Sequence, residues 1–263
     1  MYNFEYQKPA ALADAVAALG REDAKALAGG MTLIPVLKQR LNKPSVVVDL
    51  SKLGLVGITV TGETVTIGAM TTHAAVAASA DVKRAIPALA ALAGGIGDNQ
   101  VRARGTIGGS IANNDPAACY PTAALALGAT ITTNKRSIPA DQYFTGMFQT
   151  ALGDGEMITS VSFPVPAKAA YVKFKQPASR YAMVGVFVAK GPAGLRVAVT
   201  GSGQGGVFRF TAAETALAAN WSADALNGVS VSAGDMMSDI HGSAVYRAHL
   251  VGVITKRAVA AAG

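Results

Sequence analysis

Two glycine pairs have the composition and spacing of loops that could bind an anion. The first pair is Gly29 and Gly30, within "ALAGGMTLIPVLK" (26–38), where a short apolar run ends and a helix-favouring segment follows Thr32. Glycines let main-chain N–H groups approach an anion closely, and the N-terminus of a helix adds partial positive charge. The pattern is therefore compatible with a phosphate-binding loop, and equally with an ordinary tight turn.

The second pair is Gly108 and Gly109, within "GTIGGSIANNDP" (105–116), where a β-branched pair precedes the glycines and an Asn-Asn-Asp run follows. This segment alone is also compatible with a simple turn. Two such loops together could bind a diphosphate from two sides without a lysine or a metal ion. We therefore take the two loops as a candidate diphosphate site.

A third glycine cluster, "GSGQGG" (201–206), fits the G-x-G-x-x-G pattern and follows the strand-like "LRVAV". A dinucleotide-binding fingerprint requires a helix that begins at the third glycine, whereas "VFRF" here favours an extended chain. We predict a turn between two strands.

The elements around the first glycine pair predict a β-α-β unit. Residues 9–20 carry apolar side chains at helical spacing, "KALAGG" resembles a short strand, and "TLIPVLKQRL" resembles a helix capped by Thr32. The β-branched run 45–50 then completes a unit over residues 25–50. Such a unit places the glycine pair at the carboxyl end of a strand, where ligands of α/β sheets bind.

The rest of the chain predicts two further parts. Residues 53–166 contain a hairpin, two helices, a long irregular stretch over 98–121, another helix and two strands. The irregular stretch is polar and glycine-rich, and such loops often carry binding residues. Beyond two prolines near 164–169, three strands precede two helices, which predicts an antiparallel sheet with helices on one face.

Composition excludes several classes of function. The single Cys119 and three histidines offer no metal-ligand spacing and no internal disulfide. The net charge of +7 comes from scattered Lys and Arg, so it fits an anionic cofactor or an acidic partner better than nucleic acid. No apolar run reaches membrane-spanning length and no signal-peptide pattern is present, so we expect a cytoplasmic chain that does not span a membrane.

The two glycine loops in this order resemble the FAD-binding medium subunit of the molybdenum hydroxylases, the family of bacterial carbon monoxide dehydrogenase and of the flavin domain of xanthine dehydrogenase. The resemblance extends through "GAMTTHAAVA", "GEMITSVSFPVP", "KFKQPASRYAMVGV" and "GSAVYRAHLVGVITKRA", and so covers nearly the whole chain. It implies an α+β fold: an FAD-binding domain of the vanillyl-alcohol oxidase/PCMH type over 1–166, with subdomains of about 1–52 and 53–166, and a C-terminal domain over 167–263.

The resemblance also implies a set of cofactor-binding residues. Two runs match the pyrophosphate loops, two isoleucines match apolar positions that line the cofactor, Lys175 matches a lysine near the flavin ring, and Tyr181 matches an aromatic residue against the ring. The full set is Ala28, Gly29, Gly30, Met31, Thr32, Ile96, Thr106, Ile107, Gly108, Gly109, Ser110, Asp115, Cys119, Ile158, Lys175 and Tyr181.

Three positions depart from the family pattern. Met31 replaces a common His or Gln, which implies a main-chain contact there, and "ND" replaces "AD" before Pro116. Cys119 replaces an aspartate that bonds the adenosine half of the cofactor, and a thiol is a weak hydrogen-bond partner. Asp115 and Asn114 are candidates to compensate. Arg102 and Arg104 are compatible with a contact to a partner subunit or to a phosphate.

The implied function is electron transfer. A large subunit would oxidise the substrate at a molybdenum cofactor, a small subunit would carry electrons through [2Fe–2S] clusters, and FAD on this chain would pass them to NAD, a quinone or oxygen. The resemblance points to a dimer of heterotrimers, and no catalytic side chain is required here. Two alternatives remain at this point: a stand-alone flavin reductase or oxidase of the same fold, and a non-catalytic nucleotide-binding assembly module.

Overall fold

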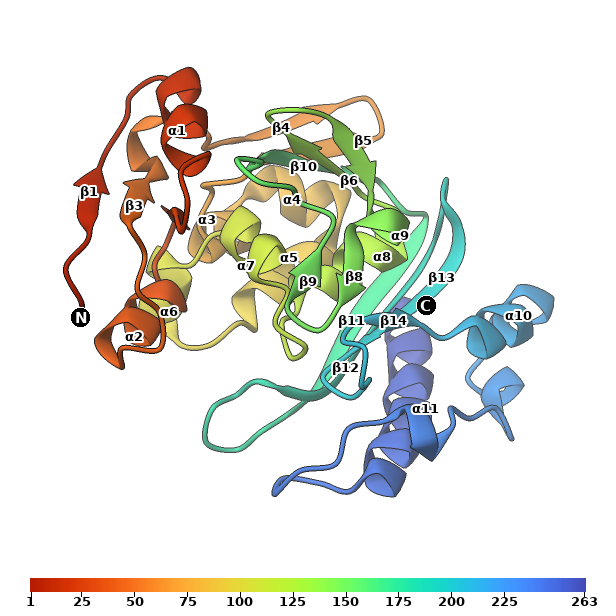
Figure 1. Cartoon of the computed structure of the whole chain (residues 1–263). Coiled ribbons are helices and arrows are strands. Elements are labelled where there is room, and N and C mark those ends of the chain that lie inside the picture. Colours follow the sequence, from red (N-terminus) through yellow and green to blue (C-terminus); the bar gives the residue numbers. More distant parts are fainter.

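The computed structural model describes all 263 residues, and its N-terminal part is a small parallel sheet with two helices (Figure 1). The strands pair in the order β1-β3-β2, and both pairs are parallel. This arrangement confirms the β-α-β unit predicted over residues 25–50. The elements are β1 (Glu5–Gln7), α1 (Leu12–Leu19), β2 (Lys25–Leu27), α2 (Leu33–Lys38), β3 (Val46–Asp49) and the 3-10 turn η1 (Leu50–Lys52).

The middle part is built on a five-stranded sheet in the order β4-β5-β10-β6-β7, with every pair antiparallel. Alternating branched side chains form its buried face, as the period of two along a strand requires. A short hairpin, β8–β9, follows as a separate two-stranded unit. The strands are β4 (Ile58–Thr61), β5 (Thr64–Gly68), β6 (Thr130–Thr133), β7 (Ser137–Pro139), β8 (Phe144–Gly146), β9 (Gln149–Thr150) and β10 (Ile158–Pro164).

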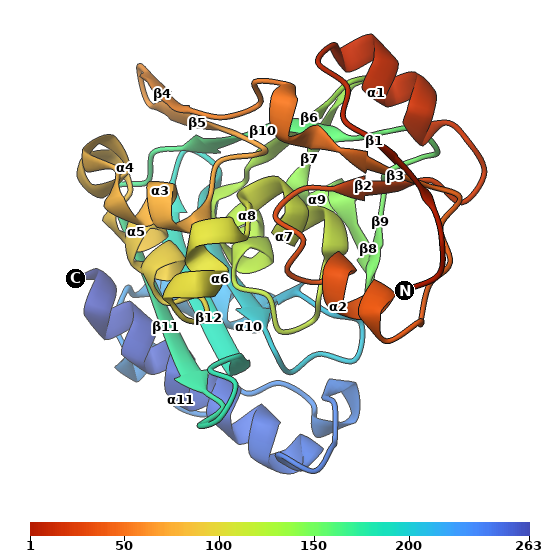
Figure 2. The same cartoon turned by 90° about the vertical axis from the view of Figure 1, so that its left-hand side faces the viewer.

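A layer of helices lies between this sheet and the C-terminal sheet (Figure 2). Helix α8 contacts β10 on one side and β12 and β13 on the other, while α5 contacts β11. All eight residues of α8 are buried, as expected for a helix covered on both sides. The helices are α3 (His73–Ala78), α4 (Ala80–Ala85), α5 (Pro87–Gly94), α6 (Asn99–Arg104), α7 (Ile107–Asn113), α8 (Tyr120–Leu127) and α9 (Ala140–Tyr143).

The stretch 98–121 is more regular than we predicted, because α6 and α7 lie within it. Both helices are short and begin at side-chain caps: Asp98 accepts a hydrogen bond from Val101 N at 2.8 Å, and Thr106 accepts one from Gly109 N at 3.2 Å. Asn114 ends α7 in the left-handed region, at φ 43°. Caps and a left-handed terminus thus define helices that the glycine-rich composition conceals.

The C-terminal part is the predicted antiparallel sheet, in the order β11-β12-β13-β14. Helix α11 packs along β11 and β12, and the "GSGQGG" segment joins β13 to β14 as a turn. No helix is both long and apolar enough to cross a membrane. The elements are β11 (Lys168–Lys175), β12 (Ala182–Gly191), β13 (Gly194–Thr200), β14 (Phe208–Arg209), α10 (Thr211–Ala219), η2 (Asp224–Leu226), η3 (Ala233–Asp235) and α11 (Ala244–Ala262).

Candidate functional site

A cavity of about 820 Å³ lies where the three parts of the chain meet. Its walls come from the segment after β2, from the segment that follows α5, from α7, and from β11 with the connection to β12. Pockets for small molecules and cofactors are of this size and occur where domains meet. A little more than half of the lining residues are hydrophobic, 20 of 38, so the cavity suits a ligand with extended apolar parts.

The first glycine loop presents a run of free donors to this cavity. None of the main-chain N–H groups from Gly29 to Thr32 donates a hydrogen bond within the chain. Gly30 has φ 76°, which turns successive N–H groups toward one side. Thr32 does not cap α2 with its side chain, contrary to our expectation, and its own N–H has no acceptor within the chain. Four consecutive unpaired donors at the start of a helix fit an anionic group such as a diphosphate.

The second glycine loop differs, because its N–H groups are used within the chain. Ile107 N donates to Thr71 O at 3.1 Å and Gly108 N donates to Ala69 O at 2.9 Å. The glycines serve close packing instead: a Cβ on Gly108 would lie 2.6 Å from the Cβ of Ala69. The expectation of two equivalent anion-binding loops is therefore corrected, since the first loop alone carries the run of free donors.

The two loops meet at Gly29. A Cβ on Gly29 would lie 2.1 Å from the carbonyl oxygen of Arg104 and 2.9 Å from Cα of Gly105, the residue before the second loop. Only a residue without a side chain allows this approach. The second loop therefore fixes the position of the first loop.

Most of the predicted residues line the cavity and three do not. Thr106 is the buried cap of α7, Ile107 is fully buried in the core, and Lys175 is exposed at the end of β11. The predicted residues that line the cavity are Ala28, Gly29, Gly30, Met31, Thr32, Ile96, Gly108, Gly109, Ser110, Asp115, Cys119, Ile158 and Tyr181.

Known proteins share this sequence and this arrangement. Residues 2–166 match the family model described as "FAD binding domain in molybdopterin dehydrogenase". The chain is 36% identical to the nicotine 6-hydroxylase medium subunit of Paenarthrobacter nicotinovorans, over 98% of this chain and 96% of that protein. It is 34% identical to the carbon monoxide dehydrogenase medium chain of Hydrogenophaga pseudoflava, with the same coverage.

This chain belongs to the FAD-binding medium subunits of the molybdenum hydroxylases. Its structure matches a chain of the reconstituted CO dehydrogenase from Oligotropha carboxidovorans with a TM-score of 0.91, at 34% identity and over 99% of this chain and 98% of that one. The relatives are subunits of dehydrogenases and hydroxylases, so this medium subunit is part of an oxidoreductase.

In this medium subunit Lys173 lines the cavity, whereas Lys175 is exposed at the end of β11. Nζ of Lys173 donates to Gly95 O at 2.7 Å and lies 3.5 Å from Sγ of Cys119. A bulge in the pairing with β12 lies beside Lys175, because Phe174 pairs with Val184 and Lys175 with Ala182. The family resemblance pointed to Lys175 alone, so Lys173 was missed.

Three more residues considered in the sequence analysis, Asp115, Cys119 and Arg102, have structural partners here. Asp115 Oδ1 accepts a hydrogen bond from Ala117 N at 2.8 Å and so stabilises the turn before α8. Cys119 is buried in the cavity wall beside Lys173. Arg102 donates from Nη1 to Ile96 O at 2.8 Å, which directs its guanidinium at the main chain and not at a phosphate.

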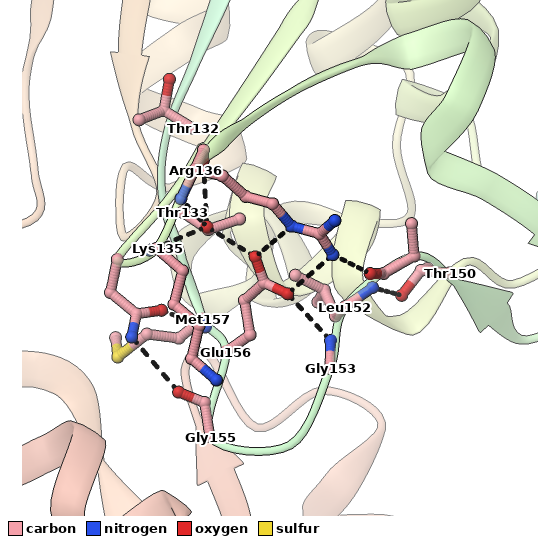
Figure 3. Close-up of polar contacts among 12 residues, drawn as sticks. Thr132, Thr133, Lys135, Arg136, Thr150, Leu152, Gly153, Gly155, Glu156 and Met157 are labelled. Carbon is pink, nitrogen blue, oxygen red and sulfur yellow. Dashed lines mark hydrogen bonds and ion pairs between the residues drawn. The ribbon is translucent and has the colours of Figure 1, made fainter.

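Sequence reasoning missed a carboxylate at the cavity wall, Glu156. Arg136 forms a bidentate pair with it, Thr133 Oγ1 donates to it at 2.8 Å, and Gly153 N donates to it at 2.9 Å (Figure 3). The hydrogen bond from Arg136 is the main cause that lowers the pKa of Glu156 to about 2. This ionised group fixes the turn from Gly153 to Glu156, and Asn134 Oδ1 accepts a hydrogen bond from Met157 N at 2.8 Å just before β10.

A buried histidine in the cavity wall was also missed. His73 begins α3, its Nδ1 has no hydrogen-bond partner, and its ring lies 5.3 Å from that of Tyr120. Burial lowers the pKa of His73 to about 4, with a further contribution from Arg102. The imidazole is therefore neutral at physiological pH and adds no charge to the cavity.

Proposed function

We propose that this medium subunit holds FAD in the cavity and relays electrons from [2Fe–2S] clusters of a small subunit to an external acceptor, while a large subunit oxidises the substrate at a molybdenum cofactor. The observation that carries the proposal is the run of four unpaired N–H groups from Gly29 to Thr32, placed in a cavity of dinucleotide size. When bound, FAD supplies the redox chemistry, and the chain supplies binding and orientation.

The residues divide this work between them. The N–H groups of the first loop would bind the diphosphate, and the apolar side chains of Ile96 and Ile158 would contact the ring systems. Lys173 would place its positive charge beside the flavin ring and favour the reduced form. Tyr181, on the connection between β11 and β12, would shield the ring from solvent.

The acidic groups at the cavity support a relay and not a substrate oxidase. Asp98 and Asp115 accept main-chain hydrogen bonds, and Glu156 is paired with Arg136. A general base for substrate oxidation needs a group that can exchange its proton near neutral pH. The low pKa of Glu156 and the neutral His73 do not meet this need.

Purification through a tag on this chain tests the proposal. We expect two further subunits to co-purify with it, together with molybdenum, iron and FAD. Removal of FAD should abolish electron delivery to NAD, a quinone or oxygen, and leave dithionite reduction of the iron–sulfur clusters intact. A chain that purifies alone with FAD and turns over a substrate by itself would contradict the proposal and favour the stand-alone oxidase.

A further inference from the structure

An aromatic side chain with no assigned role stands in the cavity wall. Phe148 is 56% exposed and lines the cavity, at the turn between β8 and β9. Its backbone has φ 55°, a left-handed conformation that is unfavourable for a bulky residue. An exposed aromatic ring on a costly backbone is a pattern typical of ligand contacts.

A buried asparagine holds the turn in this conformation. Asn114 is 1% exposed, and its Nδ2 donates to Gly146 O and to Gln149 O, each at 2.8 Å. Phe148 N in turn donates to Asn114 O at 3.1 Å. Asn114 ends α7, the helix that begins at the second glycine loop, so Phe148 is fixed relative to that loop.

Two further contacts stiffen the hairpin. Tyr143 and Phe144 pack edge to face at its base, with ring centroids 5.0 Å apart. On its outer side lies Gly206 of the "GSGQGG" turn, where a Cβ would lie 3.7 Å from Cα of Met147. This glycine motif therefore supports the hairpin from the C-terminal part of the chain.

We propose that Phe148 is a stacking wall for the adenine ring of the bound dinucleotide. This inference rests on the proposed function, because it assumes that the cavity holds FAD. Bases stack on aromatic side chains through their π faces, and a preformed ring loses little conformational entropy on binding. The conformation of the turn therefore positions the Phe148 ring before the ligand binds.

The charged residues along the cavity favour the adenine ring over the flavin ring as the group that stacks on Phe148. The cations from the C-terminal part of the chain, Lys173 and Arg180, line the cavity from β11 and its connection to β12. Figures 1 and 2 both show this connection apart from the β8–β9 hairpin. The hairpin segment brings Phe148 and Leu152 to the wall, together with Glu156, whose charge Arg136 balances. A wall without net charge suits the neutral adenine, whereas a ring that gains negative charge on reduction suits the cationic end.

Calorimetric titration of the full-length chain, freed of flavin, with ADP and separately with FMN tests the assignment. Phe148→Ala should weaken ADP binding by about 5- to 150-fold, the range that loss of one stacked base implies. Phe148→Trp should retain ADP affinity, and FMN affinity should stay the same in both variants. Tyr246→Ala removes an exposed aromatic residue outside the cavity and serves as the matched control.

Unchanged ADP affinity in Phe148→Ala, or a loss of FMN affinity in place of ADP affinity, would overturn the inference. A wild-type chain that binds neither FAD nor ADP would instead overturn the proposed function, and the inference with it. Thermal unfolding of each variant, compared with wild type, separates a lost contact from a lost fold.

Discussion

Gly29 and Arg104 lie so close together that a Cβ on Gly29 would be 2.1 Å from the carbonyl oxygen of Arg104. This approach brings the first glycine loop, with its free N–H groups, against the residues that precede the second loop. The second loop uses its own N–H groups on Ala69 and Thr71, so it is rigidly attached to the middle part of the chain. Anion binding by the first loop therefore depends on packing by the second.

Gly29→Ala is expected to separate the loops. Overpacking costs typically about 1–3 kcal/mol, and here the clash is with main-chain atoms that cannot rotate away. We expect a loss of stability in urea unfolding of that order and a loss of bound flavin in the purified protein. Gly205→Ala is the matched control, because nothing lies within 4 Å of a Cβ there. Equal flavin content in the two variants would argue against the packing role.

Lys173→Met should lower the reduction potential of the bound flavin, because the ammonium group favours the reduced form. A change on the order of 30 mV corresponds to about 1.4 kcal/mol for a two-electron couple. Lys175→Met is the matched control: it makes the same substitution at an exposed position and should leave the reduction potential unchanged. Redox titration against a reference dye measures both, and a shift in Lys175→Met alone would restore the assignment that the sequence favoured.

In Glu156→Gln the free energy of unfolding should change less between pH 4.5 and pH 2 than in wild type. The folded pKa of Glu156, about 2, lies below its ordinary value of 4.5, so its contribution is full above pH 4.5 and disappears as the pH falls toward 2. We expect the variant to be less stable than wild type at pH 7 by about 1–3 kcal/mol, the cost of leaving buried donors unpaired. The difference should vanish near pH 2.

Thermal melts between pH 2 and 7 measure this difference. Asp81→Asn is the control, since Asp81 pairs with Arg84 on the surface, where ion pairs contribute little. A difference between wild type and Glu156→Gln that stays constant over the whole range would show that the carboxylate charge is irrelevant to stability.

Cys119→Ser should retain flavin. The thiol contacts Lys173 at 3.5 Å and otherwise packs in the wall, and a weak hydrogen-bonding group contributes little to affinity. We expect a dissociation constant for FAD within about a factor of three of the wild-type value, because a weakly bonded group accounts for less than roughly 0.7 kcal/mol. Fluorescence titration measures it, and a tenfold loss would assign the thiol a direct role in binding.

Local patterns predicted much of the fold. Hydrophobic periodicity, together with Gly and Pro residues at the ends of elements, predicted the β-α-β unit around Gly29, the hairpin of β4 and β5, and the antiparallel C-terminal sheet. These elements have strong periodic signals within short windows. The helices α6 and α7 escaped prediction because each is shorter than two turns and their signals are single caps, Asp98 and Thr106.

The candidate site needed information that no local pattern carries. Whether a glycine loop has free N–H groups depends on acceptors far away in the chain, such as Ala69 and Thr71 for the second loop. That Lys173 lines the cavity while Lys175 is exposed depends on how β11 packs against the rest of the chain. In the sequence, Phe148 looks like an ordinary hydrophobic residue in a loop. Only the structure shows that Asn114, 34 positions earlier, fixes its turn by hydrogen bonds.

The flavin content of the purified chain tests the central claim most directly. Visible absorption followed by acid release and chromatography should give FAD in near-equal amount to protein, and Gly29→Ala protein prepared in parallel should give little. A colourless wild-type chain that also fails to bind added FAD would contradict the account, because the free donors of the first loop would then have no dinucleotide to bind.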